Sequence, residues 1–269
     1  METTIIVLSY NNLKRTKDCV ESIRKYLRPE TQFIVVDNGS TDGSAGYIAE
    51  LNSQTESVSI STIVLPVNTG ASAARNRAIQ QAEGSYILFL DNDTIFLDDV
   101  PKVMISKLQR HSASICGMCG ILAFDYDYYL HIHSDDITHD TETVAVPSYC
   151  MMVDRKVIDD GVVFDEGLTP FGAEDIDFCF HARSKGHTVL AGTNIPLKHF
   201  EHGSLMNLRP EYREWMDKSH TRVKQKWQTK LPINSTAKIL GMLHDRDKII
   251  LTTETEHCKF FDLARGKPH

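Results

Sequence analysis

Long apolar runs are missing from this sequence, and with them any segment that could cross a membrane as a helix. The longest runs, at residues 5–8, 33–36 and 86–90, fall far short of the roughly 20 residues that a spanning helix needs. A basic excess is missing too, because 29 Lys and Arg face 36 Asp and Glu, for a net charge of −7. Since a general nucleic-acid binder needs a basic stripe to hold phosphates, that class of protein is not expected.

Cysteine is scarce as well, and nothing marks the chain for export. Six cysteines in 269 residues give no dense disulfide framework. The first four residues lack the basic character of a signal peptide and lead straight into an apolar run. We therefore expect reduced thiols and a cytoplasmic protein. The protein could lie in the cytoplasm itself or at the inner face of the membrane.

Short apolar stretches alternate with helical patterns along most of the chain. Strands are predicted at 4–9, 32–36, 61–65, 85–90 and 188–191 and within 115–133 and 143–153, and helices at 13–27, 42–51, 72–82, 100–111, 175–185 and 209–230. The first four strands are apolar throughout rather than alternating, which is typical of a parallel sheet covered on both faces. We expect a three-layer α/β domain with right-handed crossovers.

Polar residues follow each of the first four predicted strands. Ligands of open α/β sheets bind at the carboxyl ends of the strands, so these residues are predicted to share one ligand-binding edge. They are Ser9, Tyr10 and Asn11 after the first strand, Asp37 after the second, Asn68 after the third, and Asp91, Asn92 and Asp93 after the fourth.

Asp91 and Asp93 stand two residues apart directly after a predicted buried strand. Along an extended chain, side chains at this spacing point the same way, and two like charges that close repel unless a cation lies beside them. Mg²⁺ and Mn²⁺ suit such oxygen ligands and commonly bind one or two carboxylates together with a substrate's phosphates. The alternative is a solvated turn or a helix cap before Val100.

Two further clusters lie later in the chain. Glu174, Asp175 and Asp177 open a predicted helix, where acidic residues also serve as ordinary caps. Their crowding can raise the pKa of one carboxyl group and make it a useful proton acceptor. His199 and His202 lie three residues apart beside a glycine, which favours metal or phosphate contact, with packed core histidines as the alternative.

The order and spacing of these motifs resemble glycosyltransferase family 2, the inverting enzymes with the GT-A fold. The matching stretches are IIVLSYNN at 5–12, IVVDNGSTDGS at 34–44, NTG at 68–70, ARN at 74–76, GSYILFLDND at 84–93 and GAEDIDF at 172–178. The resemblance covers about residues 3–204. It implies an α/β, three-layer nucleotide-diphospho-sugar transferase fold with a mostly parallel central sheet over 1–205, and a helical C-terminal extension over 206–269.

The resemblance also implies a reaction. A sugar would move, with inversion and with the help of Mn²⁺ or Mg²⁺, from a nucleoside-diphosphate sugar of UDP or dTDP type to a hydroxyl group. The acceptor would be a glycan or a lipid-linked glycan in polysaccharide biosynthesis, and a lipid-linked acceptor would bring peripheral membrane contact. No nucleic-acid partner is implied.

Catalytic roles follow from the same resemblance. Asp175 would be the general base that takes the proton of the acceptor hydroxyl. Glu174 would orient the acceptor or assist, and Asp177 would make a helix-end contact.

Metal and nucleotide roles are implied in the same way. Asp93 would ligate the metal ion, with His202, or alternatively His199, as a further metal or diphosphate ligand. Asp91 would approach the ribose or the ion. The nucleotide sugar would be held by Ser9, Tyr10, Asn11, Asp37, Asn68, Arg75, Asp91 and Asn92.

Two other functions fit parts of the pattern. The stretch LFLDNDT at 88–94 also resembles the first motif of haloacid-dehalogenase-type phosphatases, in which the first Asp is a phosphorylated nucleophile. That motif normally opens its fold, whereas three βα units are predicted to precede it here, and no acidic pair after a later strand completes it. A sugar-nucleotide-binding protein without turnover is the second alternative, and the intact Asp91, Asp93 and Asp175 argue against it.

Two remaining signals have simpler explanations. Cys116 and Cys119 have C-x-x-C spacing without a second such pair, so buried thiols are favoured over zinc. The run TRVKQKWQTK at 221–230 is basic. A solvated helix face explains it first, and contact with an acidic membrane surface or a phospholipid-linked acceptor second.

Overall fold

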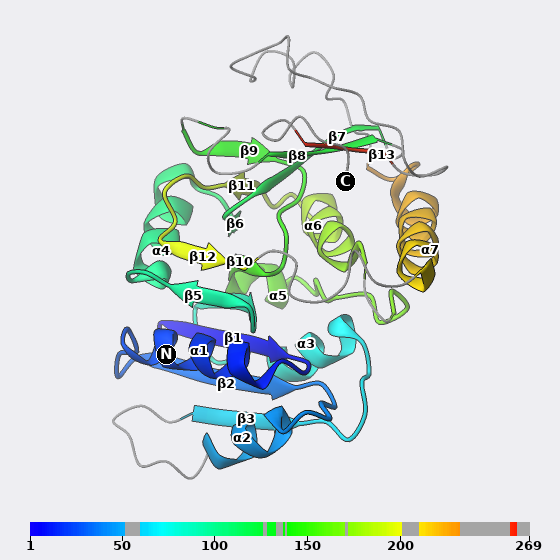
Figure 1. Cartoon of the computed structure of the whole chain (residues 1–269). Coiled ribbons are helices and arrows are strands. Elements are labelled where there is room, and N and C mark those ends of the chain that lie inside the picture. The colour runs from blue at the N-terminus through cyan, green and yellow to red at the C-terminus, as the bar shows by residue number, and fades with distance from the viewer. Residues whose placement is uncertain are drawn as a thin grey trace.

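The computed structural model (Figure 1) describes residues 1–51, 60–125, 128–132, 137, 139–169, 172–200, 210–231 and 259–262, of which the side chains at 122–132, 210–213 and 259–262 are left undescribed. The central sheet has eight strands in the order β3-β2-β1-β4-β10-β6-β11-β9. Helices pack on both faces of this sheet, so the predicted three-layer α/β domain is confirmed.

The first half of the sheet follows the sequence closely. Its elements are β1 (Thr3–Ser9), α1 (Leu13–Arg24), β2 (Thr31–Asp37), α2 (Ser44–Leu51), β3 (Ile60–Val64), α3 (Ala71–Ile79) and β4 (Tyr86–Asp91). The four strands are parallel, and Ser9 pairs with Asp37 while Leu8 pairs with Asp91. This register brings the ends of β1, β2 and β4 to nearly the same level at one edge.

The second half is less regular. Its elements are β5 (Thr94–Phe96), α4 (Val100–His111), β6 (Ile115–Gly117), β7 (Gly120–Asp125), β8 (Tyr128–Ile132), β9 (Thr141–Thr143), β10 (Cys150–Asp154), α5 (Arg155–Asp159), α6 (Glu174–Ser184), β11 (Val189–Ala191), β12 (Leu197–His199), α7 (Pro210–Trp227) and β13 (Lys259–Asp262). β10 runs antiparallel to β4 and β6, and β9 runs antiparallel to β11, whereas β6 and β11 are parallel. The sheet is therefore mostly parallel, as predicted, with two reversed strands.

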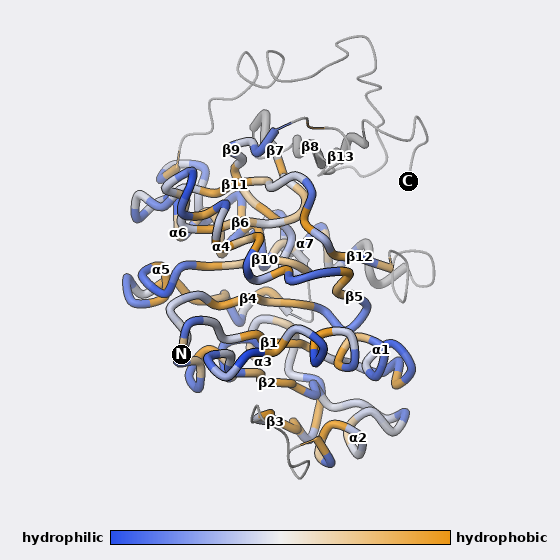
Figure 2. Tube along the Cα trace, turned by 90° about the vertical axis from the view of Figure 1, so that its left-hand side faces the viewer, coloured by the Kyte–Doolittle hydropathy of each residue, from blue (hydrophilic) through white to orange (hydrophobic). Residues whose placement is uncertain are grey.

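Two hydrophobic layers flank the sheet, because its strands carry apolar residues on both faces. Figure 2 shows the central strands coloured largely as hydrophobic. On one face Val7 and Leu90 pack with residues of α1, α2 and α4. On the other face Leu8 and Phe89 pack with residues of α3, α5, α6 and α7. Consecutive strand residues are thus buried on opposite sides, which explains why the strands show no apolar–polar alternation.

A separate two-stranded sheet, formed by β5 and β12, is absent from the sequence predictions, because its pairing joins two short segments far apart in the sequence. Leu197 pairs with Phe96 and His199 pairs with Thr94 in antiparallel register. The backbone N–H of Phe200 also donates to the Asp93 carbonyl at 3.0 Å. The pairing therefore brings the D-x-D segment beside the histidine-containing segment, far apart in sequence.

Helix α7 lies alongside α6 (Figure 1), and its Val223 and Trp227 are buried in the core. The helix predicted at 209–230 is present, but the extension is not helical throughout, since strand β13 pairs with β8. Residues 201–209, 232–258 and 263–269 lie outside the described residues. In the described stretches, no helix is both long and apolar enough to span a bilayer.

Candidate active site

The carboxyl ends of β1, β2 and β4 form the edge at which the predicted polar residues gather. Ser9 and Asp37 end β1 and β2, and Asp91 ends β4. Asn92 reaches across to the first loop, because its Nδ2 donates to the Asn11 carbonyl at 2.9 Å. The structure thus brings together residues from separate strands, as their positions in the sequence predict.

Asp37 is fully buried, and its two carboxylate oxygens differ. Oδ2 accepts hydrogen bonds from the backbone N–H groups of Gly39 at 3.1 Å and Ser40 at 3.0 Å. Oδ1 is buried and has no hydrogen-bond partner within the described part of the chain. A buried acceptor without a donor is costly, so this oxygen suits a ligand that brings its own N–H group.

The turn after Asp37 depends on Gly39. Its φ of 76° is left-handed, and a Cβ atom there would lie 2.3 Å from the backbone carbon of Val67. Glycine therefore lets the loop after β2 approach the loop after β3. Across this contact Asn38 Nδ2 donates to Asn68 Oδ1 at 3.1 Å, so Asn68 joins two of the loops at the edge.

Ser9 and Asn92 hold the first loop against the end of β4. Asn92 Nδ2 donates to Thr16 Oγ1 at 2.8 Å and lies 3.3 Å from Ser9 Oγ. The Asn11 side-chain oxygen accepts from the backbone of the second loop at 2.9 Å. Tyr10 remains 47 % exposed and presents an open ring at the rim. Ser9, Asn11 and Asn92 thus build the frame of the site, and Tyr10 offers it a contact surface.

Arg75 lies on α3 between the two acidic motifs. Its side chain is 2 % exposed, with Nη2 2.7 Å from Asp91 Oδ1 and Nη1 3.2 Å from Glu174 Oε1. Burial raises the pKa of Asp91, although the Arg75 charge works in the opposite direction. Both outer guanidinium nitrogens therefore face carboxylates, and Arg75 joins the two acidic motifs.

Asp93 and His199 face each other across the β5–β12 sheet. His199 Nε2 lies 3.3 Å from Asp93 Oδ1, and both side chains are about one-fifth exposed (19 % and 20 %). Asp93 Oδ1 has no hydrogen-bond partner of normal geometry among the described residues. His202, the first choice for a second ligand, lies outside the described residues.

A divalent cation fits this pair by its chemistry. A carboxylate oxygen suits both Mn²⁺ and Mg²⁺, the imidazole nitrogen suits a transition-metal ion such as Mn²⁺ better than Mg²⁺, and the Asp93 oxygen lacks another donor in the described residues. No three His, Cys, Asp or Glu side chains converge on one point in the described stretches. A cation held here would therefore take further ligands from a substrate's phosphates or from His202.

Asp175 is the second residue of α6 and directly follows Glu174. Burial, followed by the neighbouring Glu174 charge, raises the pKa of Asp175 from 3.8 to about 7. Its Oδ1 accepts from the Ile176 N–H at 2.8 Å, and Glu174 Oε2 accepts from the Gly172 N–H at 2.7 Å. Glu174 is thus engaged by Arg75 and the backbone, whereas Asp175 has the properties of a proton acceptor near neutral pH.

Asp177 is fully buried and serves the contact between α6 and α7. Lys226 Nζ donates to Asp177 Oδ2 at 2.8 Å, and Trp227 Nε1 donates to Oδ1 at 2.7 Å. Lys226 and Arg222 also pair with Asp165, at 3.1 Å each. Two cations of the basic run at 221–230 therefore bind carboxylates of the protein, which weakens that run as evidence of membrane contact.

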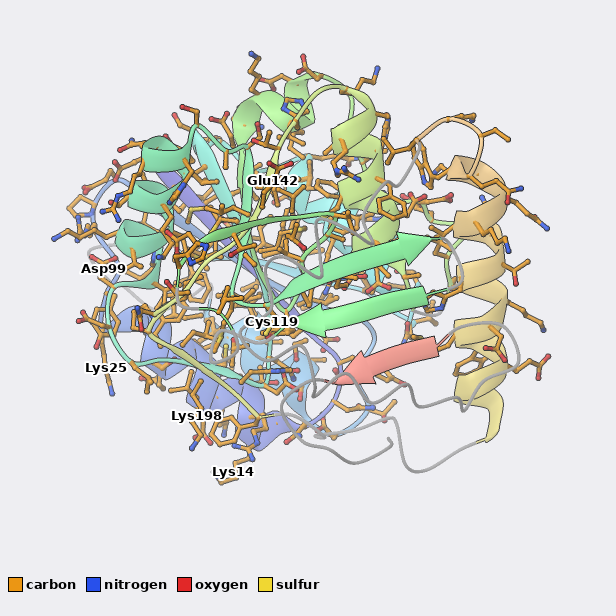
Figure 3. All side chains as sticks on the ribbon, turned by 90° about the horizontal axis from the view of Figure 1, so that it is seen from above. Lys14, Lys25, Asp99, Cys119, Glu142 and Lys198 are labelled. Atoms are coloured by element: carbon orange, nitrogen blue, oxygen red, sulfur yellow. The ribbon has the colours of Figure 1, made fainter. Side chains whose placement is uncertain are left out.

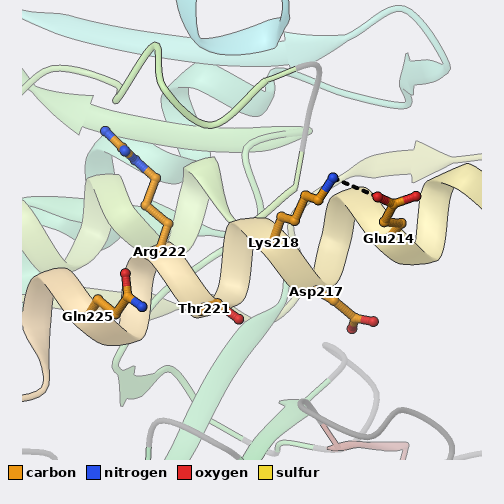
Figure 4. Close-up of a pocket in the computed structure, with 6 residues that line it drawn as sticks. All are labelled: Glu214, Asp217, Lys218, Thr221, Arg222 and Gln225. Atoms are coloured by element: carbon orange, nitrogen blue, oxygen red, sulfur yellow. Dashed lines mark hydrogen bonds and ion pairs between the residues drawn. The ribbon is translucent and has the colours of Figure 1, made fainter.

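The outer face of α7 carries an open depression of about 360 Å³ (Figure 4). Its lining residues are Glu214, Asp217, Lys218, Thr221, Arg222 and Gln225. None of them belongs to the edge described above. Chemistry at the strand ends, rather than the size of a hollow, therefore identifies the candidate site.

The C-x-x-C pair is part of the packed interior. Cys116 and Cys119 are both buried and form no disulfide. Burial raises the pKa of Cys116 to about 12, which keeps it a neutral thiol. No zinc-type cluster accompanies the pair in the described residues.

The chain belongs to glycosyltransferase family 2. The profile described as "Glycosyl transferase family 2" matches residues 4–160, more than half of the 269 residues. The TuaG glycosyltransferase of Bacillus subtilis (strain 168), named for teichuronic acid biosynthesis, is 28% identical over 159 residues, which cover 57% of this chain and 62% of TuaG. The poly-beta-1,6-N-acetyl-D-glucosamine synthase of Staphylococcus epidermidis is 30% identical over 108 residues, 40% of this chain and 26% of that protein. The matches thus span less than two thirds of these relatives.

Solved structures of glycosyltransferases share the fold. The mannosyltransferase PcManGT of Pyrobaculum calidifontis, in complex with GDP-Man and Mn²⁺, is 14% identical with a TM-score of 0.63, over 84% of this chain and 63% of PcManGT. S. aureus TarS 1-349 in complex with UDP is 19% identical with a TM-score of 0.56, over 89% and 78%. The predicted GT-A fold is confirmed by this likeness.

Two features of the site have little or no signal in the sequence. The ARN motif pointed to Arg75, but nothing in it indicates a bridge between Asp91 and Glu174. The segment of Ser148 and Tyr149 matches no motif, yet Tyr149 stacks on His199 and its carbonyl accepts from the Asp91 N–H at 3.3 Å. Both features arise from tertiary packing and become visible only in three dimensions.

Proposed function

We propose that this protein is a metal-dependent inverting glycosyltransferase that moves a sugar from a nucleoside-diphosphate sugar to a hydroxyl of a glycan or lipid-linked glycan. The observation that carries the proposal is a set of three complementary features at the strand ends and at the start of α6, which Arg75 links through Asp91 and Glu174. These are the unsatisfied buried oxygen of Asp37, the Asp93–His199 pair and the raised pKa of Asp175. Membership of family 2 and the GT-A fold support it.

The donor is expected to be of UDP or dTDP type. A uracil or thymine ring presents one N–H group between two carbonyls, which suits the single free oxygen of Asp37. The open ring of Tyr10 can stack on such a base. TarS in complex with UDP supports this choice, whereas PcManGT in complex with GDP-Man makes GDP the comparison to test.

Asp93 and His199 would hold the divalent cation, Mn²⁺ or Mg²⁺, with His202 as a further candidate. When bound, the ion neutralises charge on the departing nucleoside diphosphate. PcManGT, in complex with GDP-Man and Mn²⁺, shares this fold and supports a divalent metal. Arg75 keeps Asp91 beside the site and balances part of its charge.

Asp175 accepts the proton of the acceptor hydroxyl while that oxygen forms a bond to the anomeric carbon. The bond from the same carbon to the diphosphate oxygen breaks in this displacement, so the configuration inverts without a covalent enzyme intermediate. A pKa of about 7 makes Asp175 a stronger base than an ordinary carboxylate, yet ionised above neutral pH. Glu174, held by Arg75, orients the acceptor side.

The acceptor is expected to be a growing polysaccharide or a lipid-linked precursor of one. The names of TuaG and of the poly-beta-1,6-N-acetyl-D-glucosamine synthase support this class. The expected location is the cytoplasm, at the inner face of the membrane when the acceptor is lipid-linked.

Thermal unfolding with nucleotides tests the proposal. UDP, dTDP and GDP are each added with and without Mn²⁺, and we expect stabilisation by UDP or dTDP only when Mn²⁺ is present. Asp93→Ala should remove the metal-dependent stabilisation, while Asp217→Asn, on the outer face of α7 (Figure 4), should not. Stabilisation by none of the nucleotides, or by all of them without metal, would contradict the proposal.

Turnover separates an enzyme from a binding protein that shares this edge. Release of UDP from UDP-sugars in the presence of Mn²⁺ is expected from wild type and not from Asp175→Asn. Nucleotide binding without release would favour a sugar-nucleotide-binding protein. Phosphate release from a simple phosphoester without any sugar nucleotide would favour a phosphatase.

A further inference from the structure

We propose that Tyr149 is a positioning residue that fixes the ring of His199 for cation binding. This inference deepens the function proposed above and rests on its cation site. Tyr149 lies immediately before β10 and belongs to none of the motifs. Its ring, its hydroxyl and its carbonyl each make a contact that bears on this role.

The ring of Tyr149 lies flat on the ring of His199. The two centroids are 3.9 Å apart and the planes differ by 8°. A histidine ring rotates about a soft terminal torsion, and any large rotation here would drive its edge into the tyrosine face. The stack therefore holds the imidazole in the plane from which Nε2 reaches Asp93 Oδ1 at 3.3 Å.

Backbone pairing alone does not provide this restraint. The pairing of His199 with Thr94 and the bond from Phe200 N–H to the Asp93 carbonyl fix where the His199 backbone lies. They leave the side-chain torsions of His199 unset. Groups behind metal-binding histidines commonly set ring orientation, and the stack is a contact of this kind that acts on the ring itself.

Tyr149 is itself anchored at two points. Its Oη lies 2.8 Å from Cys119 Sγ, and its carbonyl oxygen accepts from the Asp91 N–H at 3.3 Å. Figure 3 labels Cys119, which contacts the Tyr149 hydroxyl, and Lys198, the residue before His199. The tyrosine is thus tied to the D-x-D strand and to the segment before β7, so it can hold its plane against thermal rotation of the imidazole.

The same short segment reaches the proposed base. The backbone N–H of Ser148, the residue before Tyr149, lies close enough to the Asp175 carboxyl group to lower its pKa, against the larger effect of burial. Residues 148 and 149 therefore contact the base and the cation-side histidine from one continuous piece of backbone. The packing of this segment therefore bears on the distance between the Asp175 carboxyl group and the His199 ring.

The experiment measures Mn²⁺ affinity by isothermal titration in the presence of saturating UDP. Tyr149→Leu, which removes the ring, should weaken Mn²⁺ binding roughly tenfold, the lower end of losses seen when groups behind metal ligands are removed. Tyr149→Phe keeps the ring and should bind close to wild type. Asp93→Ala and His199→Ala test the cation site itself and should weaken binding at least as much.

A matched control distinguishes positioning from general loosening of the β5–β12 sheet. Tyr26 packs its ring at 6.3 Å from that of Phe96 in β5, away from His199, and its hydroxyl donates to the Leu97 carbonyl at 3.0 Å. Tyr26→Leu should lower the melting temperature but leave Mn²⁺ affinity unchanged. If Tyr149→Leu fails to fold, Tyr149→Met keeps the bulk without the ring and takes its place.

The outcomes separate the two proposals. Weak binding in His199→Ala with wild-type binding in Tyr149→Leu would overturn the role of Tyr149 and leave the cation site intact. Wild-type binding in both Asp93→Ala and His199→Ala would overturn the cation site and the role of Tyr149 with it. Equal losses in Tyr149→Phe and Tyr149→Leu would also overturn the inference, because the ring would then not be the restraining group.

Discussion

Asp37 at the end of β2 and Asp177 at the contact between α6 and α7 are both fully buried aspartates, yet their surroundings are opposite. Asp177 has a donor for each oxygen, Lys226 and Trp227, both from α7. Asp37 has backbone donors for Oδ2, while its Oδ1 has none in the described residues. Burial alone therefore does not identify a functional carboxylate, whereas a buried oxygen without a donor does.

Asp175 extends the comparison to charge. Asp177, two residues further along α6, is matched by a lysine and holds the fold together. Asp175 has Glu174 as its neighbour and carries a raised pKa. We therefore expect substitutions in one region to change chemistry at constant stability, and substitutions in the other to change stability at constant chemistry.

The largest expected effect is on turnover. Asp175→Asn removes the proton acceptor with almost no change in shape, so the transfer rate should fall by about 10³-fold, within the range for loss of a general base. Donor binding and melting temperature should stay close to wild type. The rate is followed by UDP release, and a variant that keeps full activity would remove Asp175 from the role of base.

The next largest effect is on stability and concerns Asp177, the structural aspartate of the comparison. Asp177→Ala leaves the Trp227 N–H without its partner and leaves Lys226 with Asp165 alone, so the free energy of unfolding should fall by about 1–3 kcal/mol. Urea unfolding measures the change, and activity per folded molecule should be retained.

Lys218→Ala serves as the control for Asp177→Ala. It breaks only the Lys218–Glu214 pair on the outer face of α7, where both side chains are well exposed (Figure 4). Its cost should stay below about 1 kcal/mol. Equal losses in the two variants would contradict the view that the buried pair fastens α7 to α6.

The pH dependence of the transfer rate tests the role of Asp175 as the general base. Because its pKa is about 7, activity should rise about tenfold per pH unit below pH 7 and level off above it, giving about a hundredfold difference between pH 5 and pH 8. The folded protein binds this proton more tightly than the unfolded chain does, so its stabilising contribution is full below about pH 4 and is lost as the pH rises through 7. A rate profile that is flat from pH 5 to 8 would contradict the assignment.

The smallest expected effect is on donor affinity. Asp37→Asn would place an amide or a weaker acceptor where the base N–H is expected, so UDP affinity should fall roughly tenfold, as for one charge-assisted hydrogen bond. Titration calorimetry measures the change. Asp18→Asn, at a solvent-exposed pair on α1, is the control and should bind UDP normally.

The sequence predicted the first half of the fold well because each element carries its own signal. Apolar runs set β1 to β4, and helix α4 begins and ends as predicted, at Val100 and His111. The short strands β5 and β12 were missed, because their pairing joins segments that are distant in the sequence.

The candidate site divides in the same way. Asp37, Asp91 and Asp93 lie at strand ends, where a local rule locates them at the edge of the sheet. The bridge of Arg75 and the stack of Tyr149 on His199 depend on side chains from separate elements meeting in space. No local pattern encodes such meetings, so they could not be predicted from one sequence.

The pairing of β5 with β12 has a consequence for how such a protein can diversify. Residues 97–196 lie between β5 and β12. The pairing of Phe96 with Leu197 therefore holds the two ends of this long segment together. Insertions or exchanges in its outer loops would therefore leave this pairing, and with it the position of Asp93 beside His199, unchanged.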